Sequence, residues 1–348
     1  MRWRALWLGL WAALTLTALF QPGPDRAHIA PAATGAPAPA PVRTDAGGDA
    51  ALYRAIIGAV AKGQPYHASA AQQQRAHGYP LRPFVTMRLP TLAYVSAALG
   101  PHGLIIIAWG LLGAILLAWL RALRELVSLE RALALALIVV SAVPMLAPAP
   151  LFFHDVWAGL LIALALACWR KGQWHCRLLA SAAAATVREL AAPFAGLVGL
   201  VALIDRDRRA ITAALAVGAA LTALLVWHRA EVLAVTLAND LGSPGWSGAR
   251  GPRGLIDDLR TISLLGALPA ALAAPIGFAP LLGWSAFPPR LALMAGAWFA
   301  GLGTMIMVFA RPDNLYWSAM LLPAWFIGLA GVPRFAGVTR RAMGQARA

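Results

Sequence analysis

Four groups of ionisable residues lie beside long apolar runs of this sequence, and their types point to one kind of chemistry. They are Asp49, the pair His154-Asp155, the pair Arg188-Glu189, and the stretch Arg311-Pro-Asp313-Asn314. Ionisable side chains at membrane depth are energetically expensive, so they are functional candidates by default. A carboxylate can remove a proton from a hydroxyl as a general base. Arginine pairs with phosphate through charge-assisted hydrogen bonds.

A sugar carried on a polyprenyl phosphate would need both kinds of group. The carboxylate would take the proton of the acceptor hydroxyl, and arginine would stabilise the phosphate that leaves as an anion. Phosphate leaves without prior protonation, so one carboxylate is enough, whereas glycosidases use two. The four groups therefore predict a cavity in which a lipid-linked donor reacts.

Each group also has a structural interpretation. Asp49 and the pair His154-Asp155 can cap helices, Arg188-Glu189 can be a structural ion pair, and Arg311–Asn314 can be an ordinary turn. The functional interpretation is favoured because the predicted topology places all four groups on the same side of a membrane.

The composition excludes an ordinary soluble enzyme. Of the 348 residues, 60% are hydrophobic and 12% are charged, about half the charged share of a soluble domain. The mean hydropathy is +0.68. The net charge of +15 is then better explained by membrane topology than by nucleic acid as a partner. The two cysteines, Cys168 and Cys176, cannot build a disulfide framework or a multi-cysteine metal site.

The fold class predicted is an all-α polytopic membrane protein with about ten transmembrane helices and short helices in a long first outer loop. A span needs about 20 apolar residues. The ten apolar runs are Trp3–Phe20, Gly103–Leu120, Ala132–Leu151, Val156–Trp169, Leu178–Val187, Ala191–Ile204, Ala210–Trp227, Ile262–Trp284, Leu291–Ala310 and Leu315–Val332. The first run is expected to be an anchor, with a cleaved signal peptide as the alternative.

The basic residues orient these runs. With the N-terminus inside, 16 of the 29 Lys and Arg residues fall on the inner side, as the positive-inside rule requires. If Leu178–Ile204 were one long helix, the Arg-rich tail would lie outside, so two short segments meeting at Arg188-Glu189 are favoured. The expected location is a bacterial cytoplasmic (inner) membrane, with the cavity facing the periplasm or the outside.

Two long loops face outside in this topology. Residues 21–48 form a Pro/Ala-rich linker, and residues 49–100 form the first outer loop, with short helices over Asp49–Lys62 and Pro90–Leu99. The second loop, Arg229–Arg260, is expected to be a flexible cationic lid carrying Arg250 and Arg253. No Walker, Rossmann, HExxH or GxSxG pattern occurs.

The first outer loop resembles that of the GT-C superfamily of membrane glycosyltransferases, which includes the protein O-mannosyltransferases and the aminoarabinose and mycobacterial mannosyl transferases. The similarity lies in Asp49-Ala-Ala-Leu-Tyr53, Gly63-Gln-Pro-Tyr66, Arg82-Pro-Phe and Arg88-Leu-Pro90. His154-Asp155 matches the acidic residue of the family's second outer loop. Arg188-Glu189 and Arg311-Pro-Asp-Asn-Leu-Tyr-Trp317 look like motifs of bacterial surface-glycopolymer members.

The resemblance implies that Asp49 is the catalytic base, with Asp45 as the nearby competitor, and that Asp155 and Glu189 assist it. The residues expected to bind substrate are Tyr53, Tyr66, Arg88, His154, Arg188, Arg250, Arg253, Arg311, Asp313 and Asn314. Arg188 and Arg311 are the expected buried cations. No cofactor is expected; a divalent metal is conceivable, but His154 and Asp155 alone do not make a site.

The predicted protein is a single domain, with the first transmembrane helix at 1–20, the other transmembrane helices within 101–332 and a basic cytoplasmic tail at 333–348. Its predicted function is transfer of a sugar from a polyprenyl-phosphate donor to a glycan or lipid acceptor at the outer membrane face. The main alternative is a transporter or flippase of a lipid-linked saccharide, and a non-catalytic assembly subunit is the third possibility. Transporters place polar groups near the midplane and often show repeats, whereas these charges cluster at one face.

Overall fold

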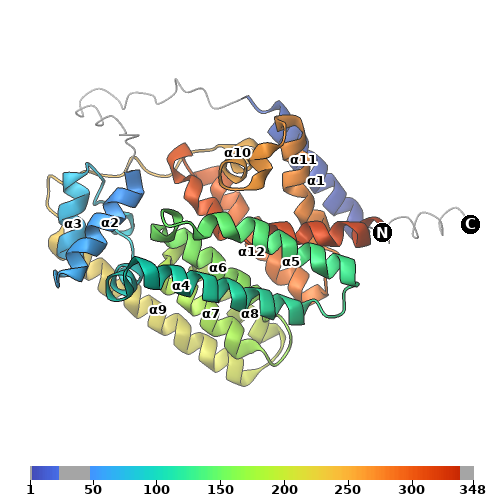
Figure 1. Ribbon diagram of the computed structural model, residues 1–348, viewed down its shortest axis with the longest axis horizontal. Coiled ribbons are helices and arrows are strands. Elements are labelled where there is room, and N and C mark those ends of the chain that lie inside the picture. Colours follow the sequence, from blue (N-terminus) through green and yellow to red (C-terminus); the bar gives the residue numbers. More distant parts are fainter. Residues whose placement is uncertain (1, 23–47, 338–348) are drawn as a thin grey trace, which may run out of the picture.

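The computed structural model describes residues 2–22 and 48–337 (Figure 1), so Asp45, most of the linker and most of the basic tail lie outside the described residues. Helices make up 79% of the structure, and no β-strand forms in the described part of the chain. The prediction of an all-helical protein is confirmed.

The chain forms twelve α-helices and seven short 3-10 helices in the described residues. The α-helices are α1 (Arg2–Phe20), α2 (Gly48–Ala61), α3 (Tyr66–Ala76), α4 (Thr91–Ala122), α5 (Ser128–Ala142), α6 (His154–Ala167), α7 (Trp174–Val187), α8 (Ala192–Ile204), α9 (Arg208–Val235), α10 (Gly251–Ile262), α11 (Ala270–Trp284) and α12 (Pro289–Phe309). The 3-10 helices are η1 (Phe84–Thr86), η2 (Val143–Leu146), η3 (Pro150–Phe152), η4 (Glu189–Ala191), η5 (Leu264–Ala267), η6 (Pro312–Met320) and η7 (Trp325–Gly331).

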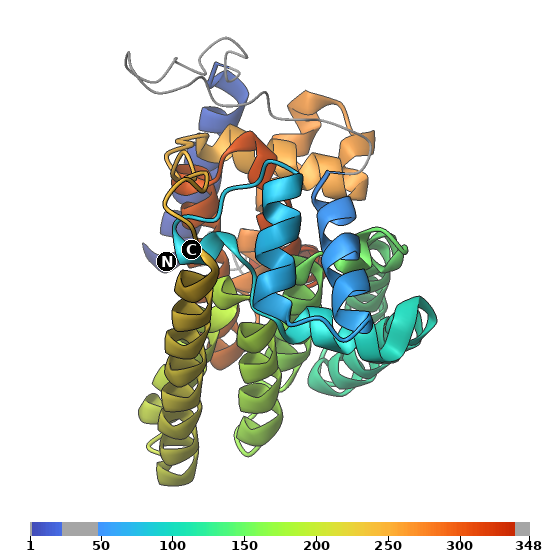
Figure 2. The same cartoon turned by 90° about the vertical axis from the view of Figure 1, so that its left-hand side faces the viewer.

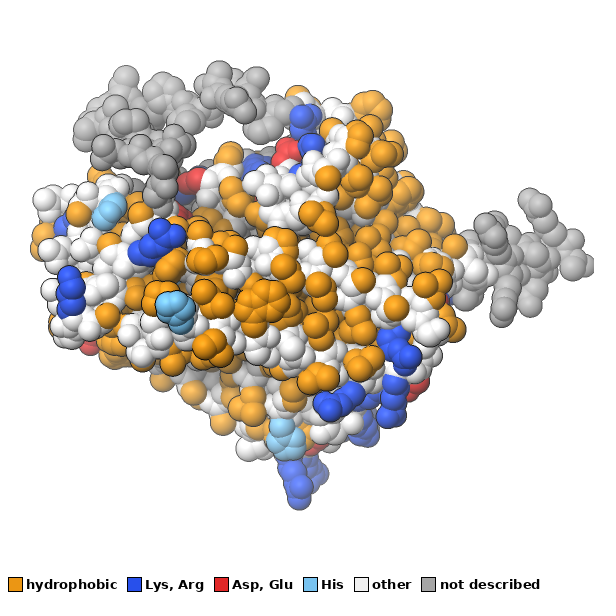
Figure 3. Space-filling model, in the orientation of Figure 1, with side chains coloured by type: hydrophobic (Ala, Val, Ile, Leu, Met, Phe, Trp, Pro, Cys, Tyr) orange, Lys and Arg blue, Asp and Glu red, His pale blue; other side chains and the backbone are white. Residues whose placement is uncertain are grey.

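Five helical segments are long and apolar enough to cross a membrane, and a sixth span is possible where η6 and the helix from Trp325 to Gly337 meet at 57°. The five correspond to α1, η1 with α4, α5 with η2, α9 and α12. Hydrophobic side chains cover much of the face in Figure 3, with one group of Lys and Arg at its lower right and others at its left end and top. These helices indicate a membrane protein. The other predicted runs form shorter helices, among them α6, the segment Glu189–Ile204 and α11.

The structure divides Leu178–Ile204 as the charge pattern predicted. Helices α7 and α8 are separate and pack against each other, with Arg188 and η4 at the vertex between them. Pro193 lies in the first turn of α8, where its missing N–H costs nothing because that donor has no helical partner. The break places Arg188 and Glu189 at one end of the helix pair.

Helix α4 bends sharply at Gly100, whose φ of 67° and ψ of 178° interrupt the helical conformation. Glycine adopts positive φ without a Cβ clash, and the following Pro101 cannot donate a helical hydrogen bond. Residues 91–99, here called the arm of α4, therefore leave the direction of the long apolar part. The predicted short helix over Pro90–Leu99, ending before Pro101, is confirmed as this arm.

Helix α6 is the centre of the main core and is buried on nearly all sides. It approaches η6 so closely that a Cβ on Gly159 would lie 2.3 Å from the Ala319 carbonyl oxygen and 2.4 Å from that of Leu322. Only glycine fits such a backbone contact. This packing places the N-terminal end of α6, with His154 and Asp155, beside the segment that carries Tyr316.

A second, smaller core joins α2, α3, η1 and the arm of α4 into an outer bundle (Figure 2). Its buried apolar residues include Leu52, Ile56, Tyr66 and Leu81. The bundle is tied to the residues after α9, where Arg75 forms two hydrogen bonds with Asp240, of 2.7 and 2.8 Å. This partner lowers the pKa of Asp240 to about 2.

Candidate functional site

A buried ion-pair network lies where α6, η4 and the outer bundle meet. The Arg188 Nε donates to Asp155 Oδ1 at 2.8 Å, and the Arg188 Nη1 donates to Glu189 Oε1. The side chains of Arg188 and Asp155 are only 1% and 2% exposed. The Arg188 Nη2 has no hydrogen-bond partner among the described residues, so one donor of this guanidinium remains free to bind an anion.

Arg88 is the second cation of the site, and 13% of its side chain is exposed. Its Nη1 lies 3.7 Å from Glu189 Oε1, and its Nε and Nη2 donate to the hydroxyls of Tyr53 and Tyr316, both at 3.2 Å. The Arg88 carbonyl accepts a 2.6 Å hydrogen bond from the Tyr66 hydroxyl. The guanidinium contacts join α2, η4 and η6, and the carbonyl of the same residue adds α3.

Asp49 lies in the first turn of α2 and accepts a 2.7 Å hydrogen bond from the Tyr79 hydroxyl. Because α2 already begins at Gly48, Asp49 lies inside the helix and the prediction that it is the N-cap is wrong. Burial raises the pKa of Asp49, while the Tyr79 hydrogen bond and Arg88 act in the opposite direction. Nearby Asp155 and Asp313 also raise it, so Asp49 shares the electrostatic environment of the network.

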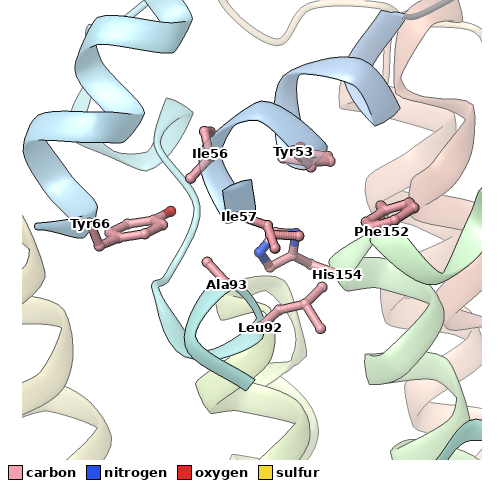
Figure 4. Close-up of a pocket in the computed structure, with 8 residues that line it drawn as sticks. All are labelled: Tyr53, Ile56, Ile57, Tyr66, Leu92, Ala93, Phe152 and His154. Atoms are coloured by element: carbon pink, nitrogen blue, oxygen red, sulfur yellow. The ribbon is translucent and has the colours of Figure 1, made fainter. Parts of the chain in front are cut away.

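A small pocket lies beside Arg88 (Figure 4). Its lining residues come from α2, α3, the arm of α4, the end of η3 and the start of α6; they are Tyr53, Ile56, Ile57, Tyr66, Leu92, Ala93, Phe152 and His154. The pocket has a volume of about 10 Å³, which is enough for about one water molecule. Binding of a larger ligand therefore requires the outer bundle to move away from α6.

All five tyrosines of the chain gather around this site. Besides the contacts of Tyr53, Tyr66, Tyr79 and Tyr316, the ring of Tyr94 lies 6.1 Å from that of Tyr66. The Tyr53 ring packs edge-on against His154 at 5.1 Å. The Tyr53 and Tyr316 hydroxyls both accept from Arg88, which leaves their protons for another acceptor.

The final polar stretch is positioned differently from the prediction. Arg311 is not a buried cation: it pairs with Asp313 at 3.0 Å and donates to the Gly245 carbonyl at 2.9 Å. Asn314 is buried, accepts from the Arg311 backbone N–H, and contacts the Tyr316 hydroxyl at 3.4 Å. The stretch therefore supplies Asn314 and Tyr316 to the site, and the second cation of the site is Arg88 rather than Arg311.

The prediction of a flexible cationic lid is also corrected. Much of the segment Arg229–Arg260 is helical, in α9 and α10. Arg250 is buried and bound to both carboxylate oxygens of Asp258, at 2.7 and 3.0 Å. Arg253 donates to the Gln21 carbonyl at 2.9 Å. Arg250 is therefore held by Asp258, and Arg253 lies beside Gln21.

Sequence reasoning missed the roles of Tyr79 and Tyr316. Tyr79 follows a turn at Gly78, 30 residues from its partner Asp49, and no local pattern encodes that pairing. Tyr316 lies in the last polar motif, but the prediction assigned the binding role to other residues of that motif. No group of three or more metal-ligating side chains forms in the described ranges.

These residues define a type of site but do not assign the chain to a known family. It holds a half-buried carboxylate that can accept a proton, the buried Arg188, the half-buried Arg88 and phenol hydroxyls, at one end of a helical membrane bundle. The chain matches no family model, no curated protein and no solved structure.

Proposed function

We propose that this protein is a membrane glycosyltransferase of the GT-C type, moving a sugar from a polyprenyl-phosphate donor to a glycan or lipid acceptor. The observation that carries the proposal is a half-buried carboxylate with a raised pKa, Asp49, in the electrostatic environment of Arg88, which shares Glu189 with the buried Arg188. A raised pKa suits a general base that works near neutral pH.

The reaction divides naturally between these groups. Asp49 takes the proton of the acceptor hydroxyl. The hydroxyl oxygen bonds to the sugar's anomeric carbon, and the bond between that carbon and the phosphate oxygen breaks. The phosphate gains one negative charge, which Arg88 and the free Nη2 of Arg188 stabilise. Asp155 and Glu189 hold the two arginines in place, so their role is positioning rather than proton transfer.

The proposed topology counts the short helices α6, α7, α8 and α11 and the bent pair at η6 and η7 as crossings, giving ten. The site then faces the outside of a bacterial cytoplasmic membrane, opposite the basic turns. The donor reaches it from the lipid phase, so no nucleotide-binding fold is required.

A lipid-linked saccharide transporter is the second candidate. It is favoured by the 57° bend between η6 and the final helix, because broken helices often form transporter binding sites. The one-sided placement of Asp49, Arg88 and Arg188 favours the transferase.

The test is release of polyprenyl phosphate from a radiolabelled polyprenyl-phosphate sugar by purified protein in nanodiscs, with a panel of sugars and glycan acceptors. We expect acceptor-dependent release. Movement of intact donor between leaflets without release would reject the transferase and support the transporter.

A further inference from the structure

Arg250 and Asp258 form a second buried ion pair, at the start of α10. The two carboxylate oxygens of Asp258 accept from Arg250 Nη2 at 2.7 Å and from Nη1 at 3.0 Å, and the two side chains are 8% and 3% exposed. The Arg250 Nη2 also donates to the Gly254 carbonyl at 3.0 Å. A Cβ on Gly254 would lie 2.3 Å from the Arg250 Cβ and 3.0 Å from its Nε. Glycine therefore leaves the space that the arginine side chain needs to reach Asp258.

This ion pair binds both ends of the segment that carries Tyr316. The Arg250 Nη1 donates to the Arg311 carbonyl at 3.3 Å, and Arg311 is the residue that precedes η6. The Ser318 hydroxyl, which is fully buried near the other end of η6, donates to Asp258 Oδ2 at 3.3 Å. Helix α10 packs against both η6 and α12. The segment is thus anchored to the ion pair on both sides of Tyr316.

Between the two anchors, η6 supplies its side chains to the site. The Tyr316 hydroxyl accepts from Arg88 Nη2 at 3.2 Å and lies 3.4 Å from Asn314 Nδ2. The helical conformation of η6 is interrupted at Asn314, whose φ is −95° and ψ is 20°. The hydrogen bonds of a 3-10 helix have poorer geometry than those of an α-helix. The path of η6, and with it the place of Tyr316, therefore depends on contacts with neighbouring elements.

Stability alone is a weak reason for such an ion pair. Replacing a buried pair by well-packed apolar residues is often neutral or stabilising, because desolvation of two charges offsets much of their attraction. Apolar residues could not donate to the Arg311 carbonyl or accept from the Ser318 hydroxyl.

We propose that Arg250 and Asp258 are positioning residues of the site, which hold η6 so that the Tyr316 hydroxyl meets Arg88. Neither of the two touches the substrate. Through Tyr316 they set the place of the guanidinium that stabilises the leaving phosphate. The effect on transfer rests on the proposed function, whereas the effect on the position of Tyr316 does not.

The experiment compares Asp258→Asn with Asp257→Asn in the full chain in nanodiscs. An amide has one oxygen, so asparagine at position 258 cannot accept from both guanidinium nitrogens, and its NH₂ group faces one of them. Asp257 is the next residue of the same helix, and its side chain is 41% exposed in a 3.8 Å pair with Arg253, so it is the matched control. The first readout is the fluorine NMR resonance of 3-fluorotyrosine in place of Tyr316. We expect Asp258→Asn to shift this resonance in the same direction as Arg88→Gln does, and Asp257→Asn to leave it unchanged.

The second readout is the transfer rate per folded molecule. In Asp258→Asn kcat should fall about 10–100-fold, because displacement of a positioned group by about 1 Å can cost 100-fold. The KM for the donor should change less, because the free Nη2 of Arg188 still binds phosphate. Ser318→Ala removes one anchor and leaves the ion pair intact, so it should fold and shift the resonance in the same direction by a smaller amount.

The outcomes separate this proposal from the proposed function because the resonance does not require transfer. A shifted resonance in Asp258→Asn and Ser318→Ala supports the positioning of Tyr316 even if the wild type releases no polyprenyl phosphate. An unchanged resonance in folded Asp258→Asn overturns the proposal even if sugar is transferred. If Asp258→Asn does not fold, Ser318→Ala decides in the same way. A normal transfer rate in a variant whose resonance has shifted also overturns it.

Discussion

Removal of Arg188 tests whether the ion-pair network is the structural support of the site. In Arg188→Leu, Asp155 would keep its burial and lose the partner that donates to it at 2.8 Å. Among the described residues, Asp155 forms no other side-chain hydrogen bond or ion pair. Glu189 retains Arg88 at 3.7 Å, so the main penalty falls on Asp155.

The magnitude follows from an uncompensated buried charge, which costs roughly 3–5 kcal/mol. Arg188→Leu should therefore lower the free energy of unfolding by about that amount. Adding Asp155→Asn removes the charge and leaves a buried polar group with a cost of roughly 1–3 kcal/mol, so the double variant should be more stable than the single one.

The assay is SDS-induced unfolding in mixed micelles, followed by circular dichroism. Glu125→Gln is the control, because Glu125 is 62% exposed in its pair with Arg170 and surface pairs contribute about 0–1 kcal/mol. If Arg188→Leu unfolds as wild type does, or if Asp155→Asn further destabilises it, the network does not support the site.

Three further predictions concern Asp49, the topology and the cysteines. The proposed transferase should lose activity as pH falls through the pKa of its base. Tyr79→Phe removes a bond that lowers the pKa of Asp49, so it should move the acidic limb of the pH–rate profile to higher pH. An unchanged limb would mean that Asp49 is not the titrating base. In a cysteine-free background, Trp246→Cys should react with an impermeant maleimide from outside, and Arg208→Cys should not. The reverse pattern would invert the topology. Arg208 is replaced rather than Asp207 because Asp207 caps α9. Cys168 and Cys176 form a disulfide in the structure. The proposed topology places this turn on the inner side of the membrane, where disulfides rarely persist, so alkylation in intact cells should find both thiols reduced. An oxidised pair would place the turn outside.

The apolar runs and the breaks between them were predictable because both depend on local sequence. The helix Asp49–Lys62, the arm before Pro101 and the vertex at Arg188-Glu189 each follow from a neighbouring breaker or charge. Local hydropathy did not define every length. The run Ala132–Leu151, for example, becomes α5, η2 and η3, with prolines at the start of both 3-10 helices.

The partners within the site were less predictable because they are chosen by tertiary packing. The pairing of Arg88 with Tyr316 spans 228 residues. The burial of Arg250 against Asp258 depends on α10 packing on its neighbours. A loop rich in glycine and arginine has the composition of a flexible lid, and only the Asp258 partner shows that Arg250 is fixed.

The most direct test of the central claim, that Asp49 is the general base, is the single-turnover transfer rate of Asp49→Asn beside Asp155→Asn. Asparagine keeps the size of Asp49 and can still accept the hydrogen bond from the Tyr79 hydroxyl through its amide oxygen, so folding and donor binding should persist. The transfer rate should fall by at least about 100-fold, the lower end of general-base contributions. Near-normal transfer by Asp49→Asn, with transfer lost in a folded, donor-binding Asp155→Asn, would contradict the account and place the base on α6.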